Sequence, residues 1–316
     1  MRKVTAMNGV STSSFALPAG DGTAAFVRRW DPAGVPKAML MIAHGVSEHA
    51  ERYDGVARKL AAAAYVVYAS DHRGHGRTAA EGKLGDAGAS GWNGTLDDLR
   101  RVLDRMRADR PNLPVFLLGH SMGSILAQRF IALHGSELAG VVLSGTPLSF
   151  AGSDDLIAQA KQAVREAGPN ELSQLFVTMF VGFNEPFEPK LTGFEWLSRD
   201  AAEVQKYVDD PLSGNPLTNA TLADFLPGWA EASSPQTRAR VPRSLPLLLI
   251  SGASDAAGLN GEAPRELAES YRALGLRDVT LTLYPEARHE IFNETNRDDV
   301  VRDMIEWLEA RAGSAG

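Results

Sequence analysis

A short apolar run, a glycine-flanked serine and a helical pattern follow one another near the middle of the chain. The run Val115–Leu118 is typical of a strand buried on both faces of a parallel sheet, and the apolar residues after the serine recur at helical spacing. A strand must therefore turn sharply into a helix at Ser121, where Gly119 and Gly123 leave room for a strained backbone. This G-x-S-x-G pattern predicts a nucleophile elbow, which lifts a serine hydroxyl above the sheet edge beside the helix N-terminus.

The pattern alone is weak evidence, because a chain with 30 glycines matches it by chance at an appreciable rate. The order of strand, turn and helix strengthens it, and the sequence contains no second match. A glycine-rich turn without chemistry stays an alternative until a base and an acid for the serine are found elsewhere in the chain.

Strands and helices alternate on both sides of this segment, which predicts an α/β fold with a doubly wound, mostly parallel sheet. The first two strands form an antiparallel hairpin. We expect a helical insertion after the sixth strand, because residues 149–245 lack a strand-like run and are divided by prolines that include Pro227. The predicted division is a core of residues 1–148 and 246–316 with a helical cap of residues 149–245. The expected strands cover residues 14–17, 24–30, 38–43, 65–69, 115–118, 139–143, 246–250 and 279–284.

Composition disfavours several classes of partner. The net charge of -7 argues against nucleic acid and anionic membrane surfaces, both of which reward a basic face. The longest apolar runs are far too short to span a bilayer, so no integral membrane segment is expected. The absence of cysteine excludes disulfides and thiolate ligands, and a cytoplasmic location fits it. The sequence leaves open whether the protein forms a homo-oligomer.

A serine nucleophile needs a general base, and the base needs a carboxylate that orients it. In such a sheet both follow later strands, in the chain order serine, acid, histidine. Asp255 and His289 each follow one of the last two strands, so we predict a triad of Ser121, His289 and Asp255. Glu262 competes with Asp255, but it begins the next helix, where an acidic residue offsets the helix dipole. None of the other histidines is expected to act as the base, because hydrogen bonding within the scaffold is the commoner role of a histidine.

Acyl transfer also requires hydrogen-bond donors for the oxyanion. The backbone N–H of Met122, directly after the serine, is one candidate, and that of Val46, in the loop after the third expected strand, is the other. A metal site is disfavoured, because Asp71, His72 and His75 cluster like ligands but lie among glycines that suit a packed loop. The chemistry needs no cofactor.

Taken together, these segments resemble α/β-hydrolases of the monoacylglycerol lipase and lysophospholipase type, which are grouped with serine aminopeptidase-like hydrolases. The resemblance implies the α/β-hydrolase fold, the same triad and oxyanion donors, and a helical cap. Ser47 departs from the family, which often has glycine or alanine there, and the acid loop lacks the Asp-x-Asp-Pro pattern common in it. The matching segments are His44–His49, Asp71–Gly76, Gly119–Gly123, Asp209–Pro211 and Ala287–Glu294.

The predicted activity is hydrolysis of a monoacyl or short-to-medium chain carboxylic ester, so the expected partner is a small-molecule ester or monoacyl lipid. Amide- or thioester-cleaving hydrolases and acyltransferases stay open, as does a small-molecule binder that kept the fold without turnover. We expect His120, Phe176, Phe180 and Phe183 to contact the substrate. The aromatic residues belong to the apolar residues 175–183, which either line an acyl tunnel or only pack the cap onto the sheet.

Overall fold

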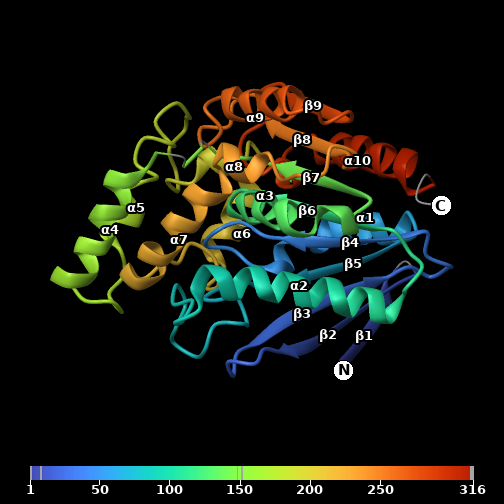
Figure 1. The fold of residues 1–316 in the computed structure, drawn as a ribbon, viewed down its shortest axis with the longest axis horizontal. Helices are drawn as coiled ribbons and strands as arrows, with labels where there is room; N and C mark the ends of the chain where they lie inside the picture. Colours follow the sequence, from blue (N-terminus) through green and yellow to red (C-terminus); the bar gives the residue numbers. More distant parts are fainter. Residues whose placement is uncertain (1, 8, 148, 151, 314–316) are drawn as a thin grey trace.

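The computed structural model describes residues 2–7, 9–147, 149–150 and 152–313. These residues form a nine-stranded sheet in the order β1-β2-β3-β5-β4-β6-β7-β8-β9, covered by helices (Figure 1). Strands β4 to β9 are mutually parallel, and β1, β2 and β3 extend one edge in antiparallel pairs. The doubly wound, mostly parallel sheet is therefore confirmed. The strands are β1 (Arg2–Met7), β2 (Val10–Pro18), β3 (Ala24–Asp31), β4 (Ala38–Ala43), β5 (Tyr65–Ser70), β6 (Val115–His120), β7 (Gly140–Ser144), β8 (Leu247–Gly252) and β9 (Val279–Tyr284).

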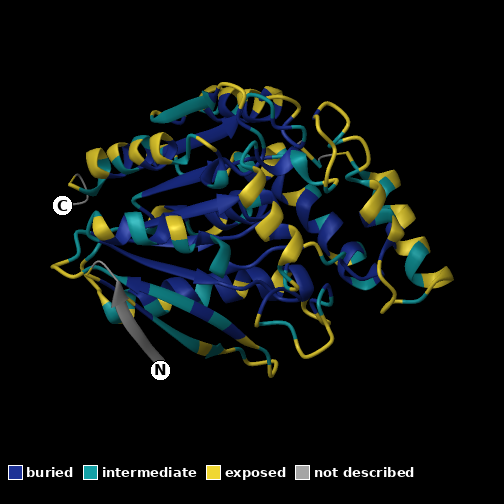
Figure 2. Ribbon diagram, turned by 180° about the vertical axis from the view of Figure 1, so that it is seen from behind, coloured by how far each residue is buried: buried dark blue, intermediate teal, exposed yellow. Residues whose placement is uncertain are grey.

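Two buried clusters lie on the two faces of the sheet. One packs the sheet against α2, α3, α7 and α9, and the other packs it against α1 and α10. The central strands are buried throughout, whereas the outer helices show exposed residues on one side (Figure 2). The α-helices are α1 (Asp54–Ala62), α2 (Gly91–Asp109), α3 (Met122–His134), α4 (Asp154–Glu166), α5 (Gln174–Thr178), α6 (Ala201–Asp209), α7 (Asn219–Ala232), α8 (Pro235–Arg238), α9 (Glu262–Ala273) and α10 (Arg297–Ala312). Short 3-10 turns are η1 (Ala50–Tyr53), η2 (Gly135–Glu137), η3 (Glu195–Leu197) and η4 (Ile291–Asn293).

The first strand corrects the prediction. The sequence analysis placed no strand before residue 14, but β1 pairs antiparallel with β2 at the edge of the sheet. An edge strand of this kind is held by backbone hydrogen bonds and needs no continuous apolar run, so the pattern of side chains did not reveal it. As a consequence, the insertion follows the seventh strand of the chain and not the sixth.

Between β7 and β8, the described residues form helices α4 to α8 and one isolated bridge, with no strand of the main sheet. These helices lie mainly at the end of the molecule toward which the parallel strands point (Figure 1). Pro227 lies inside α7 and does not divide two helices there. Burial of Phe225 and Trp229 against the core stabilises that helix despite the missing N–H.

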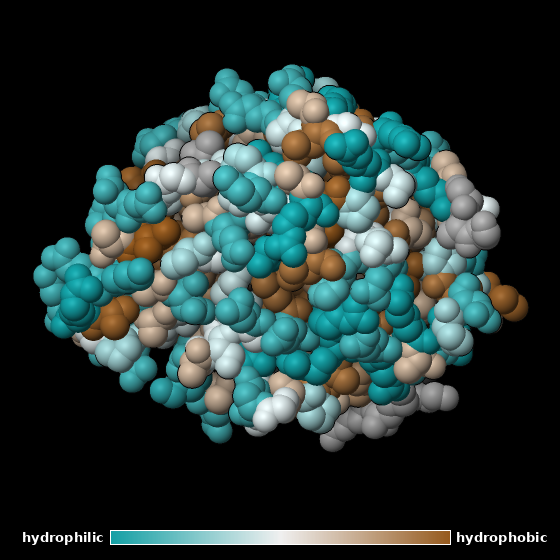
Figure 3. Space-filling view, in the orientation of Figure 1, coloured by the Kyte–Doolittle hydropathy of each residue, from teal (hydrophilic) through white to brown (hydrophobic). Residues whose placement is uncertain are grey.

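Helix α7 packs against α2 and α3 and belongs to the same buried cluster as the sheet, whereas α4 packs on α7 farther out. In the orientation of Figure 1, hydrophobic residues appear on the surface over α4 and α5 amid a mostly hydrophilic surface (Figure 3). Exposed apolar residues of this part of the chain include Leu172, Val177 and Val181. None of the helices in the described ranges is both long and apolar enough to cross a membrane.

Candidate active site

The backbone at Ser121 is strained. Ser121 lies between the end of β6 and the first residue of α3. Its φ of 52° and ψ of -118° lie outside the regions that residues with a side chain prefer. A Cβ at Gly119 would lie 2.3 Å from the Gly123 carbonyl oxygen, and one at Gly123 would lie 2.0 Å from that of Ala43. The two glycines therefore allow the close approach on which the predicted elbow depends. The half-buried Ser121 hydroxyl has no hydrogen-bond partner among the described residues.

His289 and Asp255 lie in direct contact. His289 Nδ1 and Asp255 Oδ1 are 2.9 Å apart, and both side chains are buried. Asp255 also accepts hydrogen bonds from the Ala257 amide at 3.0 Å and the Ser251 hydroxyl at 3.2 Å. His289 lines the same cavities as Ser121. The structure thus brings the three predicted triad residues to one edge of the sheet, while Glu262 lies in the first turn of α9 as expected.

Burial and charge act in opposite directions on this pair. Burial alone would raise the pKa of Asp255, but the nearby His289 and the hydrogen bonds to the carboxylate hold it below its ordinary value. Burial alone would lower the pKa of His289, but the Asp255 carboxylate raises it above its ordinary value. This arrangement stabilises the imidazolium that forms when a histidine accepts a proton.

The two predicted oxyanion donors lie beside Ser121. Val46 and Met122 line the same cavity as the serine, and neither backbone N–H donates to another group in the described part of the chain. A hydrogen bond holds the Val46 loop in place, since the preceding Gly45 N–H donates to Glu48 Oε1 at 2.6 Å. A Cβ at Gly45 would lie 2.7 Å from that oxygen, so this close approach requires glycine.

A buried ion network connects the Val46 loop to the His289 loop. The Arg52 guanidinium donates to both Glu290 oxygens, at 2.6 and 2.7 Å, and to Glu48 Oε2 at 2.8 Å. Tyr53 donates to Glu48 Oε1 at 2.8 Å, and the Arg52 guanidinium lies 4.8 Å from the centre of the Tyr207 ring. Glu48 adjoins the predicted oxyanion loop and Glu290 follows the predicted base. One arginine therefore fixes the positions of these two loops relative to each other.

Ser47, which departs from the resembled family, has a φ of 59° in the left-handed region. Such a backbone favours glycine, but the Ser47 hydroxyl donates to the Asn215 carbonyl at 2.8 Å and the Ser47 carbonyl accepts the Gly214 N–H at 2.8 Å. Nearby, His49 Nε2 lies 2.6 Å from Asp210 Oδ2. Serine at position 47 therefore lacks the backbone freedom of glycine, but its hydrogen bonds connect this loop directly to the insertion.

The histidines before the elbow form a packed cluster. The His44 and His72 ring centres are 4.0 Å apart, and His44 Nε2 accepts the His72 N–H at 2.8 Å. Burial lowers the pKa of His72 to about 3. No group of three or more metal-ligating side chains is arranged around a common point in the part of the chain that the structure describes.

His120 packs against the predicted base and also lines the first cavity beside Ser121. Its ring centre is 4.8 Å from that of His289, and its Nδ1 lies 3.3 Å from the Ser144 hydroxyl. Burial, followed by the nearby His289, lowers the pKa of His120 to about 3, so it stays neutral. It reaches the wall of one cavity with an uncharged ring.

Two cavities meet at Ser121 and His289. The first has a volume of about 280 Å³, and its wall combines aromatic residues with the polar side chains of Ser47, Glu48 and Tyr207. The second has a volume of about 270 Å³ and an almost wholly apolar wall. Residues that line both cavities are Val46, Ser121, Phe180, Trp196 and His289. The apolar wall of the second is completed by Met122, Ile125, Pro147, Phe150, Met179, Phe183, Trp229, Ala256, Ala257 and Leu259.

The three predicted phenylalanines occupy different positions in these walls. Phe176 is buried and lines only the first cavity, Phe183 lines only the second, and Phe180 lies between the two. The Phe180 ring also contacts Trp196, with ring centres 6.0 Å apart. Packing and cavity lining are thus both observed for this segment.

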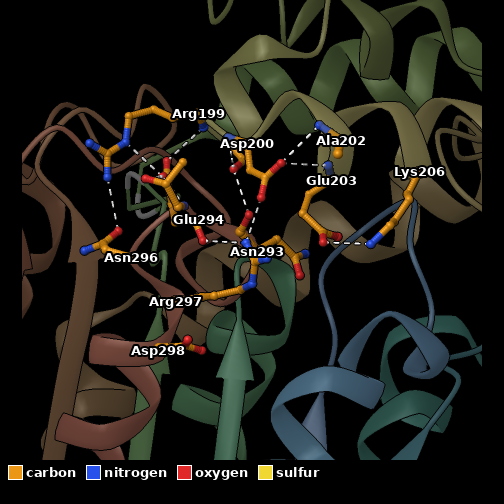
Figure 4. A network of polar contacts seen from close by, with 12 residues as sticks. Arg199, Asp200, Ala202, Glu203, Lys206, Asn293, Glu294, Asn296, Arg297 and Asp298 are labelled. Carbon is orange, nitrogen blue, oxygen red and sulfur yellow. Dashed lines mark hydrogen bonds and ion pairs between the residues drawn. The ribbon is translucent and has the colours of Figure 1, made fainter.

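A second polar network joins the insertion to the loop after His289 (Figure 4). Glu294 is fully buried and accepts hydrogen bonds from the Arg199 Nε at 2.9 Å and the Arg288 amide at 2.9 Å. On the same side, Arg297 Nη1 donates to Asp200 Oδ2 at 2.7 Å. The loop that carries the predicted base is therefore held by two sets of contacts, one with Arg52 and one with the insertion.

The sequence analysis assigned no individual role to Glu48, Arg52, Glu290 or Glu294. The four charged residues lie in or beside the segments that carry the family resemblance, and a carboxylate next to a catalytic position in an apolar loop signals a buried partner. That partner, Arg52, lies 238 residues from Glu290 in the chain, so the sequence pattern could not identify it.

The sheet order, the turn at Ser121 and the loops around it define an α/β-hydrolase. Comparison with known proteins specifies the class further, since residues 34–296 match the family described as "Serine aminopeptidase, S33". The chain belongs to this family of α/β-hydrolases.

Individual relatives align over most of the chain. It is 31% identical to the monoglyceride lipase of Homo sapiens, over 94% of this chain and 90% of the relative. It is also 31% identical to a monoacylglycerol lipase of Mycolicibacterium smegmatis, over 88% of this chain and 90% of the relative. Among solved structures, a thermostable carboxyl esterase from Bacillus coagulans in complex with glycerol superposes with a TM-score of 0.88 at 28% identity, covering 95% of this chain and 99% of that one.

Proposed function

We propose that this chain is a serine hydrolase that cleaves carboxylic esters through an acyl-enzyme on Ser121, with monoacylglycerols as its substrate class. The observation that carries the proposal is the hydrogen bond between buried Asp255 and His289, at the junction of two cavities that Ser121 also lines. The similarity to monoglyceride and monoacylglycerol lipases supports this substrate class.

The reaction follows from the roles that these groups can perform. His289 takes the Ser121 proton as the serine oxygen attacks the ester carbonyl, and Asp255 stabilises the resulting imidazolium. The oxyanion accepts hydrogen bonds from the Val46 and Met122 amides. His289 then protonates the alcohol as its bond to the acyl carbon breaks. In the second half, His289 takes a proton from water as the water oxygen attacks the acyl carbon. His289 then gives that proton to the Ser121 oxygen as its bond to the acyl carbon breaks, which releases the carboxylic acid and free serine.

The two cavities divide the substrate. The apolar cavity, whose wall includes Ile125, Phe183 and Trp229, suits the acyl chain because burial of methylene groups is favourable there. The first cavity, with Ser47, Glu48 and Tyr207 in its wall, suits the hydroxyl-bearing alcohol. Residues 149–245 act as a cap that supplies Phe180, Phe183 and Trp196 to these walls.

The test compares the native chain with Ser121→Ala. Native enzyme should hydrolyse p-nitrophenyl octanoate and 1-monooctanoylglycerol, and a fluorophosphonate should add one adduct mass at Ser121. The Ser121→Ala variant should lose turnover and labelling, while Ser136→Ala, an exposed serine on η2, should retain both. Ester turnover that survives Ser121→Ala would refute the assignment. Cleavage of aminoacyl arylamides without ester cleavage would place the chain among amide hydrolases instead.

A further inference from the structure

A third cavity, of about 190 Å³, lies next to the apolar one. Ile125 of α3 and Pro147 of the loop after β7 line both cavities, so these residues form the partition between them. The third cavity differs in chemistry, because Gln128, Thr146 and Arg238 contribute polar atoms to its wall. We call it the distal polar cavity, since it lies farther along α3 from Ser121 than the apolar cavity does.

Three polar atoms in this wall form no hydrogen bond with any residue that the structure describes. Gln128 and Thr146 are each only 3% exposed. Among the described residues, no group forms a hydrogen bond with Gln128 Oε1, Thr146 Oγ1 or the Nε of Arg238. Buried polar groups in proteins are nearly always paired. Three such atoms around one cavity therefore indicate an occupant that forms hydrogen bonds.

The wall selects the chemistry of that occupant. Gln128 Oε1 accepts a hydrogen bond, Arg238 Nε–H donates one and the Thr146 hydroxyl does either. The cavity also includes the Glu266 carboxylate, so its one guanidinium is balanced by one carboxylate. A neutral group that both donates and accepts, such as a hydroxyl, matches this set better than an anion or a cation, either of which would face a like charge.

The distance along α3 limits where the hydroxyl lies in a substrate. Gln128 lies on α3, seven residues beyond Ser121, which precedes the first residue of that helix. This separation is about 10 Å along the helix axis, roughly the length of an extended eight-carbon chain. An acyl chain bound to Ser121 that passes through the apolar cavity would therefore bring its distal end to the partition at Ile125 and Pro147.

We propose that the distal polar cavity, where unpartnered Gln128 Oε1, Thr146 Oγ1 and Arg238 Nε adjoin the apolar cavity, binds a hydroxyl group at the distal end of a medium-length acyl chain. This inference rests on the proposed ester hydrolysis at Ser121 and specifies its substrate class as esters of terminally hydroxylated acids. No bond forms or breaks in the distal cavity. It contributes specificity, because the hydroxyl would otherwise lie unpaired among apolar side chains.

The experiment measures kcat/KM for p-nitrophenyl octanoate and for its 8-hydroxy derivative. For native enzyme, kcat/KM for the hydroxylated ester should be no more than about threefold below that for the plain ester. In the double variant Gln128→Leu, Thr146→Val, which removes both side-chain oxygens with little change of shape, the ratio of hydroxylated to plain ester should fall by about tenfold or more. The ratio within one preparation is independent of the fraction of folded enzyme.

Gln162→Leu is the matched control, because this exposed glutamine of α4 lies outside all three cavities and should leave the ratio unchanged. A ratio that is the same in native enzyme and double variant, with the plain ester hydrolysed by both, would overturn the distal subsite while ester hydrolysis stands. A native ratio below about one tenth would overturn it equally. Failure of native enzyme to hydrolyse plain octanoate would refute the proposed function, and the inference with it.

Discussion

Replacing Arg52 by methionine should destabilise the protein strongly and in a way that depends on pH. The guanidinium is buried and forms three hydrogen bonds of 2.6 to 2.8 Å with Glu290 and Glu48. Methionine preserves much of the volume but leaves two buried carboxylates without a cation. Breaking a buried ion pair from one side typically costs about 3–5 kcal/mol of unfolding free energy.

The pKa of Glu290 gives a second route to the magnitude. Burial alone would raise it, but the Arg52 guanidinium holds it at about 2, against an ordinary 4.5. A folded-state pKa below the unfolded one stabilises the protein above pH 4.5 and ceases to do so as the pH falls toward 2. The shift corresponds to on the order of 3 kcal/mol at neutral pH, which agrees with the range for a broken pair.

The pH dependence of the variant has the opposite sign. Without Arg52, burial raises the pKa of Glu290 above its unfolded value. The charged carboxylate is then destabilising at neutral pH, and its protonation removes that penalty. The difference in unfolding free energy between native protein and Arg52→Met should therefore be largest near pH 7 and shrink toward pH 4.

Urea unfolding at pH 7, 5.5 and 4 measures this difference. Arg302→Met is the control. Among the described residues, exposed Arg302 of α10 pairs with Asp299 and Asp303, and surface pairs of this kind add little stability, so this variant should unfold almost as native protein does at each pH. A difference for Arg52→Met below about 1 kcal/mol, or one that does not change between pH 7 and 4, would refute the reasoning.

Three further predictions concern catalysis. Ser121→Ala and His289→Ala should each lower kcat by at least roughly 10³-fold, and the double variant should lower it no further. Multiplicative losses in steady-state assays would contradict a triad. Asp255→Asn should also lower kcat severely. kcat/KM should rise with pH to a plateau with its midpoint above pH 6.5, because the base must be neutral and Asp255 raises the pKa of His289; a flat profile from pH 5 to 9 would count against this. Phe180→Asp or Phe183→Asp should lower activity on medium- and long-chain monoacylglycerols while sparing p-nitrophenyl acetate and the melting temperature, whereas equal loss on all esters with a lower melting temperature would indicate packing alone.

Except for β9, which is only partly buried, the parallel strands are buried and read as short apolar runs, so the sequence predicted them. Val115–Leu118 is the clearest example, and it forms most of β6. Edge strand β1 carries no such run, so it was missed. Helix α7 passes through Pro227 because tertiary burial outweighs the local preference of proline.

For the site, the positions of Ser121, Asp255 and His289 could be predicted because the sheet fixes where strands end. Ser121 directly follows β6, and Asp255 and His289 lie in the loops after β8 and β9. Contacts between loops could not be predicted in this way. Arg52 and Glu290 meet because two loops from distant parts of the chain lie side by side, which depends on side-chain packing in three dimensions. The same holds for the unpartnered atoms of the distal polar cavity, which no spacing in the sequence indicates.

The contacts of Ser47 bear on how the insertion takes part in catalysis. Its hydroxyl and carbonyl bind Asn215 and Gly214 of the insertion, and its neighbour Val46 is a proposed oxyanion donor. A displacement of residues 210–215 would therefore shift the Val46 amide and weaken the stabilisation of the oxyanion. Among the hydrogen bonds of the described residues, none joins residues 175–183 to Val46 or Ser47, and the exposed side chains of this segment include Val181 at the cavity wall. Substrate entry can therefore involve movement of residues 175–183 while residues 210–215 stay fixed, which separates access to the site from the geometry of catalysis.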